Sequence, residues 1–295
     1  MRKFVNYLFL IVGLVLISLV ISDFIYTQIY IKSSPRNKLQ YLLKKQPENY
    51  DVVFLGSSRV ENHINTSMFD TLSNLKTLNL GVQGAGLNDN LLLLKLLIEK
   101  NRVKNLVLQL DNNIEGTEPS NISNAEALPF IRSNKIVKLH EENYLNNFET
   151  KMYIPFYRYM IYDPKIGFRE LFMSVMGKNP RIALEDGFSP KFGTINKKGK
   201  YALPNTRPPR KNFILDKIRA ICNENNIKLF LFTAPYCENL GNPEYIDFLK
   251  MYYPNLINLS KGFSNDLFYD CGHLNAKGAD TLTINLYSIL GNQLQ

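Results

Sequence analysis

Asp51-Val-Val-Phe-Leu-Gly-Ser-Ser-Arg59 is a short apolar run that ends abruptly in a glycine and two serines. Such a run is typical of a buried parallel strand that delivers side chains to the carboxyl edge of a sheet. Gly56 permits a tight turn, and the small hydroxyl residues after it leave room for a ligand. A serine in this position can act as a nucleophile only if a base lies beside it.

Strand-like and helix-like patterns alternate along the chain around this stretch. The strand-like runs are residues 51–55, 76–80, 105–110, 228–232 and 255–259, and helical patterns cover 68–75, 87–100, 212–225 and 275–290. This alternation predicts an α/β fold with a central parallel sheet of about five strands and right-handed crossovers. Ligands bind such sheets at the carboxyl ends of the strands, where the first three runs end in small or polar residues.

Residues 115–210 interrupt the alternation. They contain two helical stretches, 145–162 and 167–176, followed by sequence rich in proline, glycine and lysine. We expect a mainly helical insertion between the third and fourth strands, forming a cap beside the strand ends. Its aromatic side chains either line a sugar-binding surface or pack the cap onto the sheet; they include Tyr153, Tyr157, Tyr159 and Tyr162.

The N-terminus carries an apolar segment. Residues 4–22 are almost wholly apolar, and about 19 residues at roughly 1.5 Å each can span a bilayer core. Arg2 and Lys3 precede the segment, which favours a cytoplasmic N-terminus, although Lys32 and Arg36 on the far side oppose this orientation. A cleaved signal peptide is the alternative, but the run is long and no small-x-small cleavage site follows it.

We therefore divide the chain into three parts. Residues 1–31 form the cytoplasmic N-terminus and transmembrane anchor, 32–49 a linker and leading helix, and 50–295 the main domain with its insertion 115–210. A single-pass anchor of this orientation places the main domain in the periplasm or outside the cell.

Composition narrows the class of function. The chain has 295 residues, a formal net charge of +9 and a pI near 9.2. A basic balance suits nucleic acid, an anionic membrane or an acidic glycan, but no nucleic-acid motif is present. The basic stretch 197–211 is either a solvated loop or an acidic-glycan contact.

The cysteine pattern argues against a structural zinc site. There are three cysteines and no CxxC pair, and structural zinc sites use closely spaced ligand pairs. Metal binding by Asp270, Cys271 and His273 is disfavoured. A bridge between Cys237 and Cys271 is left open for an extracytoplasmic domain.

A base for the serine can be sought among only three histidines, His63, His140 and His273. Only His273 follows an aspartate at the mouth of the last helix, in Asp270-Cys-Gly-His273. This spacing lets the carboxylate orient one ring nitrogen while the other faces a serine. Gly84, after the second strand, can offer a backbone N–H to an oxyanion, and Asn113, after the third, a side-chain amide.

These residues, in this order, resemble the blocks of the SGNH hydrolases, also called the GDSL family. Gly56-Ser57-Ser58 stands for Gly-x-Ser after the first strand, and Asp270-Cys-Gly-His273 for Asp-x-x-His before the last helix. The second block of the family has a glycine after the second strand, and here it is Asn79-Leu-Gly-Val-Gln-Gly84. The third has an asparagine after the third strand, and here it is Leu110-Asp-Asn-Asn113. Gly-Ser-Ser-Arg in place of Gly-Asp-Ser-Leu resembles membrane-anchored branches tied to cell-envelope acylation. The third-block asparagine is either Asn113 or Asn112.

The resemblance implies a flavodoxin-like three-layer fold and a serine esterase or O-acyltransferase that acts on ester groups of a cell-surface glycan. It implies Ser58 as nucleophile, His273 as base, Asp270 as the residue that orients it, and an oxyanion hole of Ser58, Gly84 and Asn113. It implies no cofactor and no metal. The expected partners are an O-acylated surface polysaccharide, the membrane and envelope assembly proteins, and no nucleic acid.

Several alternatives stay open at this point. Ser57 is the adjacent candidate nucleophile, and Ser58 can instead be a turn or N-cap serine. Arg59 either holds a substrate carboxylate or pairs with a nearby acid. A catalytically inactive member that binds glycan or an export partner is the second functional hypothesis. A nucleotide-binding domain is disfavoured because the chain lacks a Walker-type motif and GxGxxG after a strand.

Overall fold

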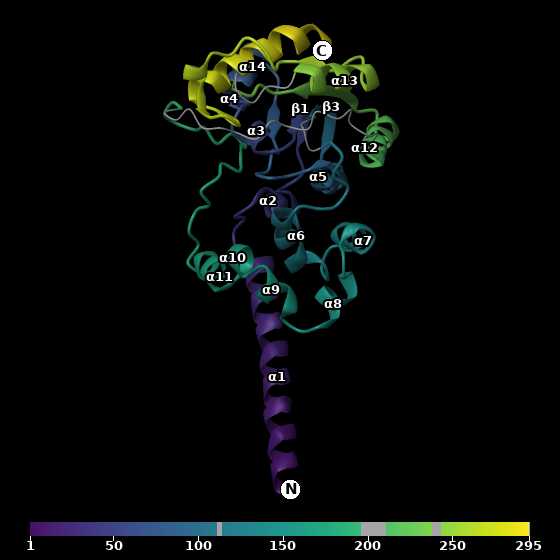
Figure 1. Ribbon diagram of the computed structural model, residues 1–295, viewed down its shortest axis with the longest axis vertical. Helices are drawn as coiled ribbons and strands as arrows, with labels where there is room; N and C mark the ends of the chain where they lie inside the picture. The colour runs from purple at the N-terminus through teal and green to yellow at the C-terminus, as the bar shows by residue number, and fades with distance from the viewer. Residues whose placement is uncertain (111–113, 196–210, 238–242, 295) are drawn as a thin grey trace. The chain divides into compact units, whose positions relative to one another are not determined.

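The structure is a computed structural model that describes residues 1–110, 114–195, 211–237 and 243–294 (Figure 1). The chain divides into two compact units. The first contains Met1–Gln40 and Asn121–Pro180, and the second contains Tyr41–Ser120 and Arg181–Gln295. The segment 115–210, which we expected to form one insertion, is therefore shared between the two units.

The second unit is built on a parallel sheet, which confirms the predicted α/β architecture. Its five strands are ordered β2-β1-β3-β4-β5, and each neighbouring pair is parallel. The strands are β1 (Asn49–Leu55), β2 (Thr77–Asn79), β3 (Arg102–Gln109), β4 (Lys228–Thr233) and β5 (Ile257–Asn258). Each of the five overlaps one of the strand-like runs in the sequence, with bounds that differ by up to three residues.

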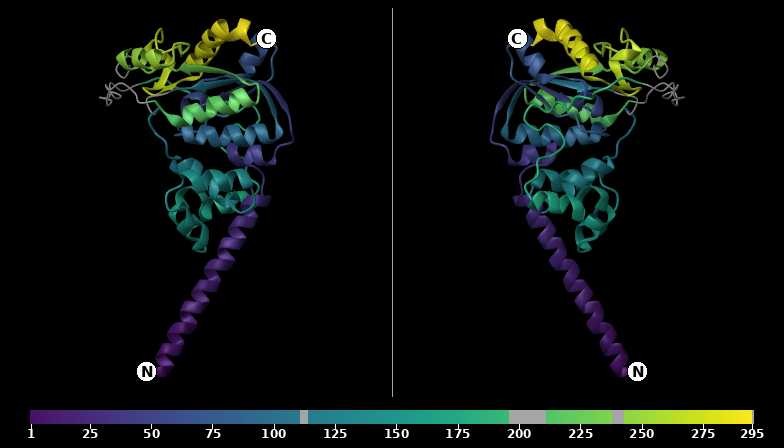
Figure 2. Two further views of the ribbon diagram at one scale, coloured as in Figure 1. Left: turned by 90° about the vertical axis from the view of Figure 1, so that its right-hand side faces the viewer. Right: turned by 90° about the vertical axis from the view of Figure 1, so that its left-hand side faces the viewer.

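Helices cover both faces of this sheet (Figure 2). α4 and α14 pack together on one face, and α5 and α12 pack together on the other. The helices of the unit are α3 (Ser58–Glu61), α4 (Thr66–Ser73), α5 (Leu87–Lys100), α12 (Phe213–Glu224), α13 (Pro243–Tyr252) and α14 (Ala276–Leu290), with the 3₁₀ turns η2 (Asn265–Leu267) and η3 (Gly291–Gln293). A short antiparallel hairpin, β6 (Phe268–Asp270) and β7 (His273–Leu274), precedes α14.

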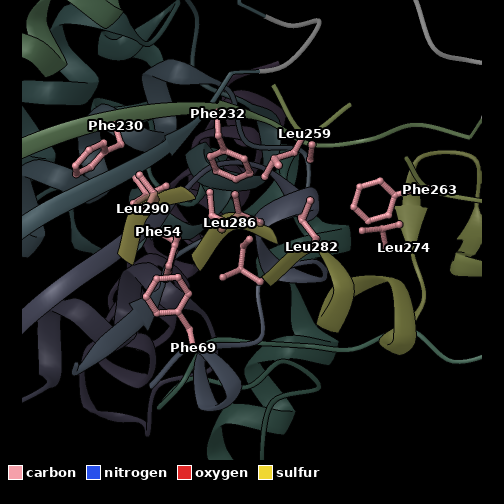
Figure 3. Close-up of a cluster of buried hydrophobic side chains, with 14 of the residues drawn as sticks. Phe54, Phe69, Phe230, Phe232, Leu259, Phe263, Leu274, Leu282, Leu286 and Leu290 are labelled. Carbon is pink, nitrogen blue, oxygen red and sulfur yellow. The ribbon is translucent and has the colours of Figure 1, made fainter. Parts of the chain in front are cut away.

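A cluster of buried apolar side chains joins one face of the sheet to α14 (Figure 3). Leu282, Leu286 and Leu290 recur every four residues, so they lie on one face of the helix, and all three are buried. They meet side chains from β1 and β4. Phe54 of β1 also packs edge-on against Phe69 of α4, with ring centroids 5.2 Å apart. This core holds the last helix, and the hairpin before it, against the sheet.

The first unit is helical and is built on α1 (Arg2–Lys32). α1 has 31 residues, and its most apolar window has a mean hydropathy of 2.8, so it is long and apolar enough to cross a membrane. α11 and η1 pack on it, and its buried residues are Asp23, Thr27 and Tyr30. The other elements are α6 (Asn121–Ala127), η1 (Leu128–Phe130), α7 (Lys135–Tyr144), α8 (Phe148–Tyr153), α9 (Tyr157–Ile161), α10 (Asp163–Ile166) and α11 (Phe168–Val175); α2 (Lys38–Lys44) crosses the boundary between the two units along the chain.

The single helix predicted at 145–162 is wrong, because the structure divides it into α8 and α9. Pro155 lies at the break, and proline lacks the N–H that a continuous helix needs. Phe156 beside it adopts φ 65°, in the left-handed region. Some aromatics of this region pack on α1: Tyr159 is buried and its ring stacks on Tyr30, with centroids 6.1 Å apart, whereas Tyr153 is exposed.

Candidate active site

The turn after β1 brings the two serines into different environments. Ser57 is the N-cap of α3, and its Oγ accepts a hydrogen bond from the N–H of Arg59 at 3.2 Å. The same hydroxyl donates to Gln109 Oε1 at 3.0 Å, and the Ser57 N–H donates to that oxygen at 3.1 Å. Capping therefore engages Ser57, and Ser58 is the serine that faces the hairpin.

Two glycines let the turn sit tightly against its neighbours. A Cβ at Gly56 would come within 2.7 Å of Gln109 Cβ, and a Cβ at Gly81 would come within 2.8 Å of the Ser57 carbonyl oxygen. Real side chains do not approach that closely, so the backbone can pack here only without them. These contacts fix the serine turn against the ends of β2 and β3.

Ser58, His273 and Asp270 form a continuous hydrogen-bonded chain. Ser58 Oγ lies 2.8 Å from His273 Nε2, and His273 Nδ1 lies 2.9 and 3.0 Å from the two carboxylate oxygens of Asp270. We expected residues 270–273 to form a loop. The structure makes them a hairpin instead, with Asp270 paired to His273 across β6 and β7.

Backbone groups hold the Asp270 carboxylate in place. Its Oδ1 accepts hydrogen bonds from the N–H groups of Gly272 at 2.8 Å and His273 at 2.9 Å. Because the carboxylate only accepts, a neutral His273 ring carries its hydrogen on Nδ1 and leaves Nε2 to accept from the Ser58 hydroxyl. The His273 side chain is 25% exposed, and Ser58 is half-buried. Such an arrangement can transfer the serine proton to the imidazole.

A second histidine supports the hairpin from inside the protein. His63 is fully buried, and its Nε2 accepts the N–H of Leu274 at 2.9 Å. Its ring lies edge-on to that of His273, with centroids 6.1 Å apart. Burial, reinforced by the positive charge of Arg59 and by His273, holds the pKa of His63 well below its usual value. A neutral His63 is the form that can accept this hydrogen bond.

Arg59 is directed inward. It is 4% exposed, and its Nη2 donates to the carbonyl oxygens of Ala234 and Pro235. Its guanidinium carbon lies 3.6 Å from the centroid of the Tyr236 ring. These contacts give Arg59 a role in holding the segment after β4, and binding of a substrate carboxylate stays a prediction.

The segment held by Arg59 is also joined to the hairpin. Cys237 and Cys271 form a disulfide, and the Cys237 N–H donates to the Cys271 carbonyl oxygen at 3.2 Å. Both sulfurs belong to the buried cluster of the second unit. The bridge left open by the sequence is therefore present, and Cys222 is a buried free cysteine in α12.

Gly84 and Asn113 are the residues predicted to complete the oxyanion hole beside Ser58. Gly84 lies in the exposed turn after β2 with φ 74°, and its oxyanion role stays a prediction. Asn112 and Asn113 lie outside the described residues, as do positions 197–210 of the basic stretch 197–211. In the described ranges, no group of three histidine, cysteine, aspartate or glutamate side chains is placed to hold a metal.

Sequence reasoning missed Gln109 and Asn79. Gln109 ends β3 and binds Ser57, as described above, while Asn79 ends β2 and donates to the carbonyl oxygens of Val60 and Ile64. Both are polar residues at the carboxyl end of an apolar strand, the same signal that singled out the serines. In this strand order the direction of winding reverses between β1 and β3, which is where open α/β sheets bind ligands.

Comparisons with protein-family models and with curated proteins give no match for this chain.

Proposed function

We propose that this chain is a membrane-anchored serine esterase or O-acyltransferase of the SGNH type, acting outside the cytoplasm on ester groups of a cell-surface glycan. The observation that carries the proposal is the Ser58–His273–Asp270 chain, with 2.8 Å between the serine oxygen and the imidazole nitrogen. Its three members occupy the positions that the family resemblance assigns to nucleophile, base and orienting acid.

Each residue has a defined role in the proposed reaction. Ser58 Oγ attacks the ester carbonyl while His273 Nε2 takes its proton, and Asp270 stabilises the imidazolium that forms. The Ser58 N–H, the Gly84 N–H and the Asn113 amide stabilise the oxyanion. The imidazolium then protonates the leaving alcohol. The acyl group is then on Ser58. Its transfer to water gives hydrolysis, and its transfer to a sugar hydroxyl gives O-acyl transfer.

The fold supports the same assignment. The strand order β2-β1-β3-β4-β5 is the order of flavodoxin-like sheets, the architecture that the resemblance implies. We infer that the helices of 121–180 form a mainly helical insertion between β3 and β4 of that fold.

Two features support a location outside the cytoplasm. α1 is apolar enough to cross a membrane, and positive residues at its N-terminus favour the cytoplasmic side. The Cys237–Cys271 disulfide suits an oxidising compartment. We infer a single-pass protein of the cytoplasmic membrane with its second unit in the periplasm or outside the cell.

Turnover of an activated ester tests the proposal. The full-length protein in detergent should release p-nitrophenol from p-nitrophenyl acetate, and Ser58→Ala should remove the enzyme-dependent rate. Ser57→Ala is the matched control and should keep most of it. Absence of turnover by the folded wild-type protein would instead favour the catalytically inactive, glycan-binding alternative.

A further inference from the structure

A cavity of about 520 Å³ lies against α1 in the first unit. α1 lines it from Val20 to Ile31, at positions three or four residues apart, so a single face of the helix forms the wall. Arg132 and Pro155 are among the residues that complete it. The apolar run of α1 ends at Ser22, so the cavity begins where the expected membrane segment stops.

Asp23 and Arg132 line the polar side of this cavity, and the buried Arg158 pairs with Asp23. Asp23 is buried and forms ion pairs with Arg158 and with Arg132, the latter at 3.5 Å. Arg158 is also buried, and its Nε and Nη1 have no hydrogen-bond acceptor among the described residues. Two guanidinium groups therefore face one carboxylate. The Arg132 side chain is 46% exposed, which makes it the cation that a ligand in the cavity can reach.

The other side of the cavity is apolar and continues the surface of the membrane segment. Val20, Phe24 and Ile31 belong to this side, and Phe24 is 64% exposed. Tyr153 and Ile154, which precede Pro155, are exposed as well. Exposed aromatic and aliphatic side chains at the end of a membrane segment suit the interface between head groups and acyl chains.

We propose that this cavity binds an anionic phospholipid of the outer bilayer surface. The lipid phosphate accepts hydrogen bonds from Arg132, and an acyl chain lies along Val20 and Phe24. A soluble anion would use only the charged side, whereas a phospholipid fits both sides and approaches from the bilayer. This inference rests on the membrane anchoring in the proposed function, and it is independent of the chemistry at Ser58.

Native mass spectrometry of the full-length protein, titrated in detergent with phosphatidylglycerol or phosphatidylcholine, tests this site. We expect the wild-type chain to bind phosphatidylglycerol more tightly than phosphatidylcholine. Arg132→Ala should weaken phosphatidylglycerol binding about tenfold, because it removes a charge-assisted hydrogen bond. Arg132→Lys should weaken it less. Arg169→Ala is the matched control, since Arg169 is an exposed arginine on α11 of the same unit.

A second pair of variants tests the apolar wall. Val20→Trp should obstruct acyl-chain binding, and Val12→Trp places the same side chain on α1 away from the cavity. Equal phosphatidylglycerol binding by wild type, Arg132→Ala and Val20→Trp would overturn the proposal. Displacement of the lipid by inorganic phosphate at comparable concentration would also overturn it, because the site would then recognise only a soluble anion.

Two further measurements on the same protein variants separate the possible failures. Release of the chain from membranes by alkaline carbonate would show that the anchoring is wrong, and the lipid site would fail with it. If the chain stays in the membrane but Arg132→Ala does not change phosphatidylglycerol binding, only the lipid site is overturned. Ester turnover reports on Ser58 in either case.

Discussion

The guanidinium of Arg59 stacks on the ring of Tyr236, with 3.6 Å between the guanidinium carbon and the ring centroid. Arg59 directly follows Ser58, and Tyr236 directly precedes Cys237, whose disulfide partner Cys271 lies between Asp270 and His273. The segment 234–237 therefore holds both the helix that carries the serine and the hairpin that carries the histidine. We therefore expect the 2.8 Å contact between Ser58 and His273 to depend on this shared support.

Removing the disulfide should impair both stability and reactivity. The double variant Cys237→Ser/Cys271→Ser should lose about 2–5 kcal/mol of unfolding free energy, the usual cost of losing a native bridge. It should also react more slowly at Ser58 with a fluorophosphonate probe, because the hairpin is no longer held to the segment after β4. Urea unfolding and labelling rates measure the two effects. Cys222→Ala, the control, should leave the labelling rate unchanged, and a wild-type rate in the double variant would argue against the disulfide as a support.

Replacing Arg59 distinguishes a positioning role from substrate binding. Arg59→Met leaves the carbonyl groups of Ala234 and Pro235 without this donor, which should cost about 1–3 kcal/mol of unfolding free energy. Labelling of Ser58 by an uncharged fluorophosphonate should slow by tenfold or more, since misplacement by about 1 Å can cost 10²-fold in rate. Arg59→Lys should restore little, because lysine lacks the planar fork. Unchanged labelling with weakened binding of carboxylated substrates would instead support the substrate role.

We expect the folded protein to lose stability in mild acid because of His63. Its pKa is lowered well below 6.5 in the folded protein by burial, so the unfolded chain takes up a proton that the folded chain does not. The His63 contribution is therefore fully present above the unfolded value near 6.5 and is lost as pH falls toward the lower folded value, by up to about 1.4 kcal/mol per pH unit.

The matched variant is His63→Gln, whose side-chain oxygen can still accept the Leu274 N–H but does not titrate. Urea unfolding between pH 8 and 5 should show the wild-type protein losing stability more steeply than this variant below pH 6.5. Parallel curves for the two proteins would exclude a buried neutral His63.

The sheet could be predicted from sequence because its signals are local. Each strand is a short apolar run closed by small or polar residues, and the helix Leu87–Lys100 was predicted with the bounds that the structure gives it. α6 and α7 were missed because they are short and carry many polar residues, and their apolar side chains pack within the helical unit around α1. The contacts of Gln109 with Ser57, and of His63 with Leu274, join residues 52 and 211 positions apart. No local pattern specifies such pairs.

The resemblance already favoured Ser58 over Ser57, and the structure adds the physical difference between the two serines. The two hydroxyls are adjacent in the sequence, one on the N-cap of α3 and the other on its first residue. Only the neighbouring strand, through Gln109, and the hairpin, through His273, give them different partners.

Site-resolved labelling with a fluorophosphonate probe tests the central claim most directly. The full-length protein in detergent should carry the label on Ser58, as located by peptide mass spectrometry. Ser58→Ala should abolish labelling, Ser57→Ala should retain it, and His273→Ala should slow it by about 10²–10⁴-fold, the usual contribution of a general base. Label on another residue, or undiminished labelling of Ser58→Ala, would contradict the assignment of Ser58 as the nucleophile.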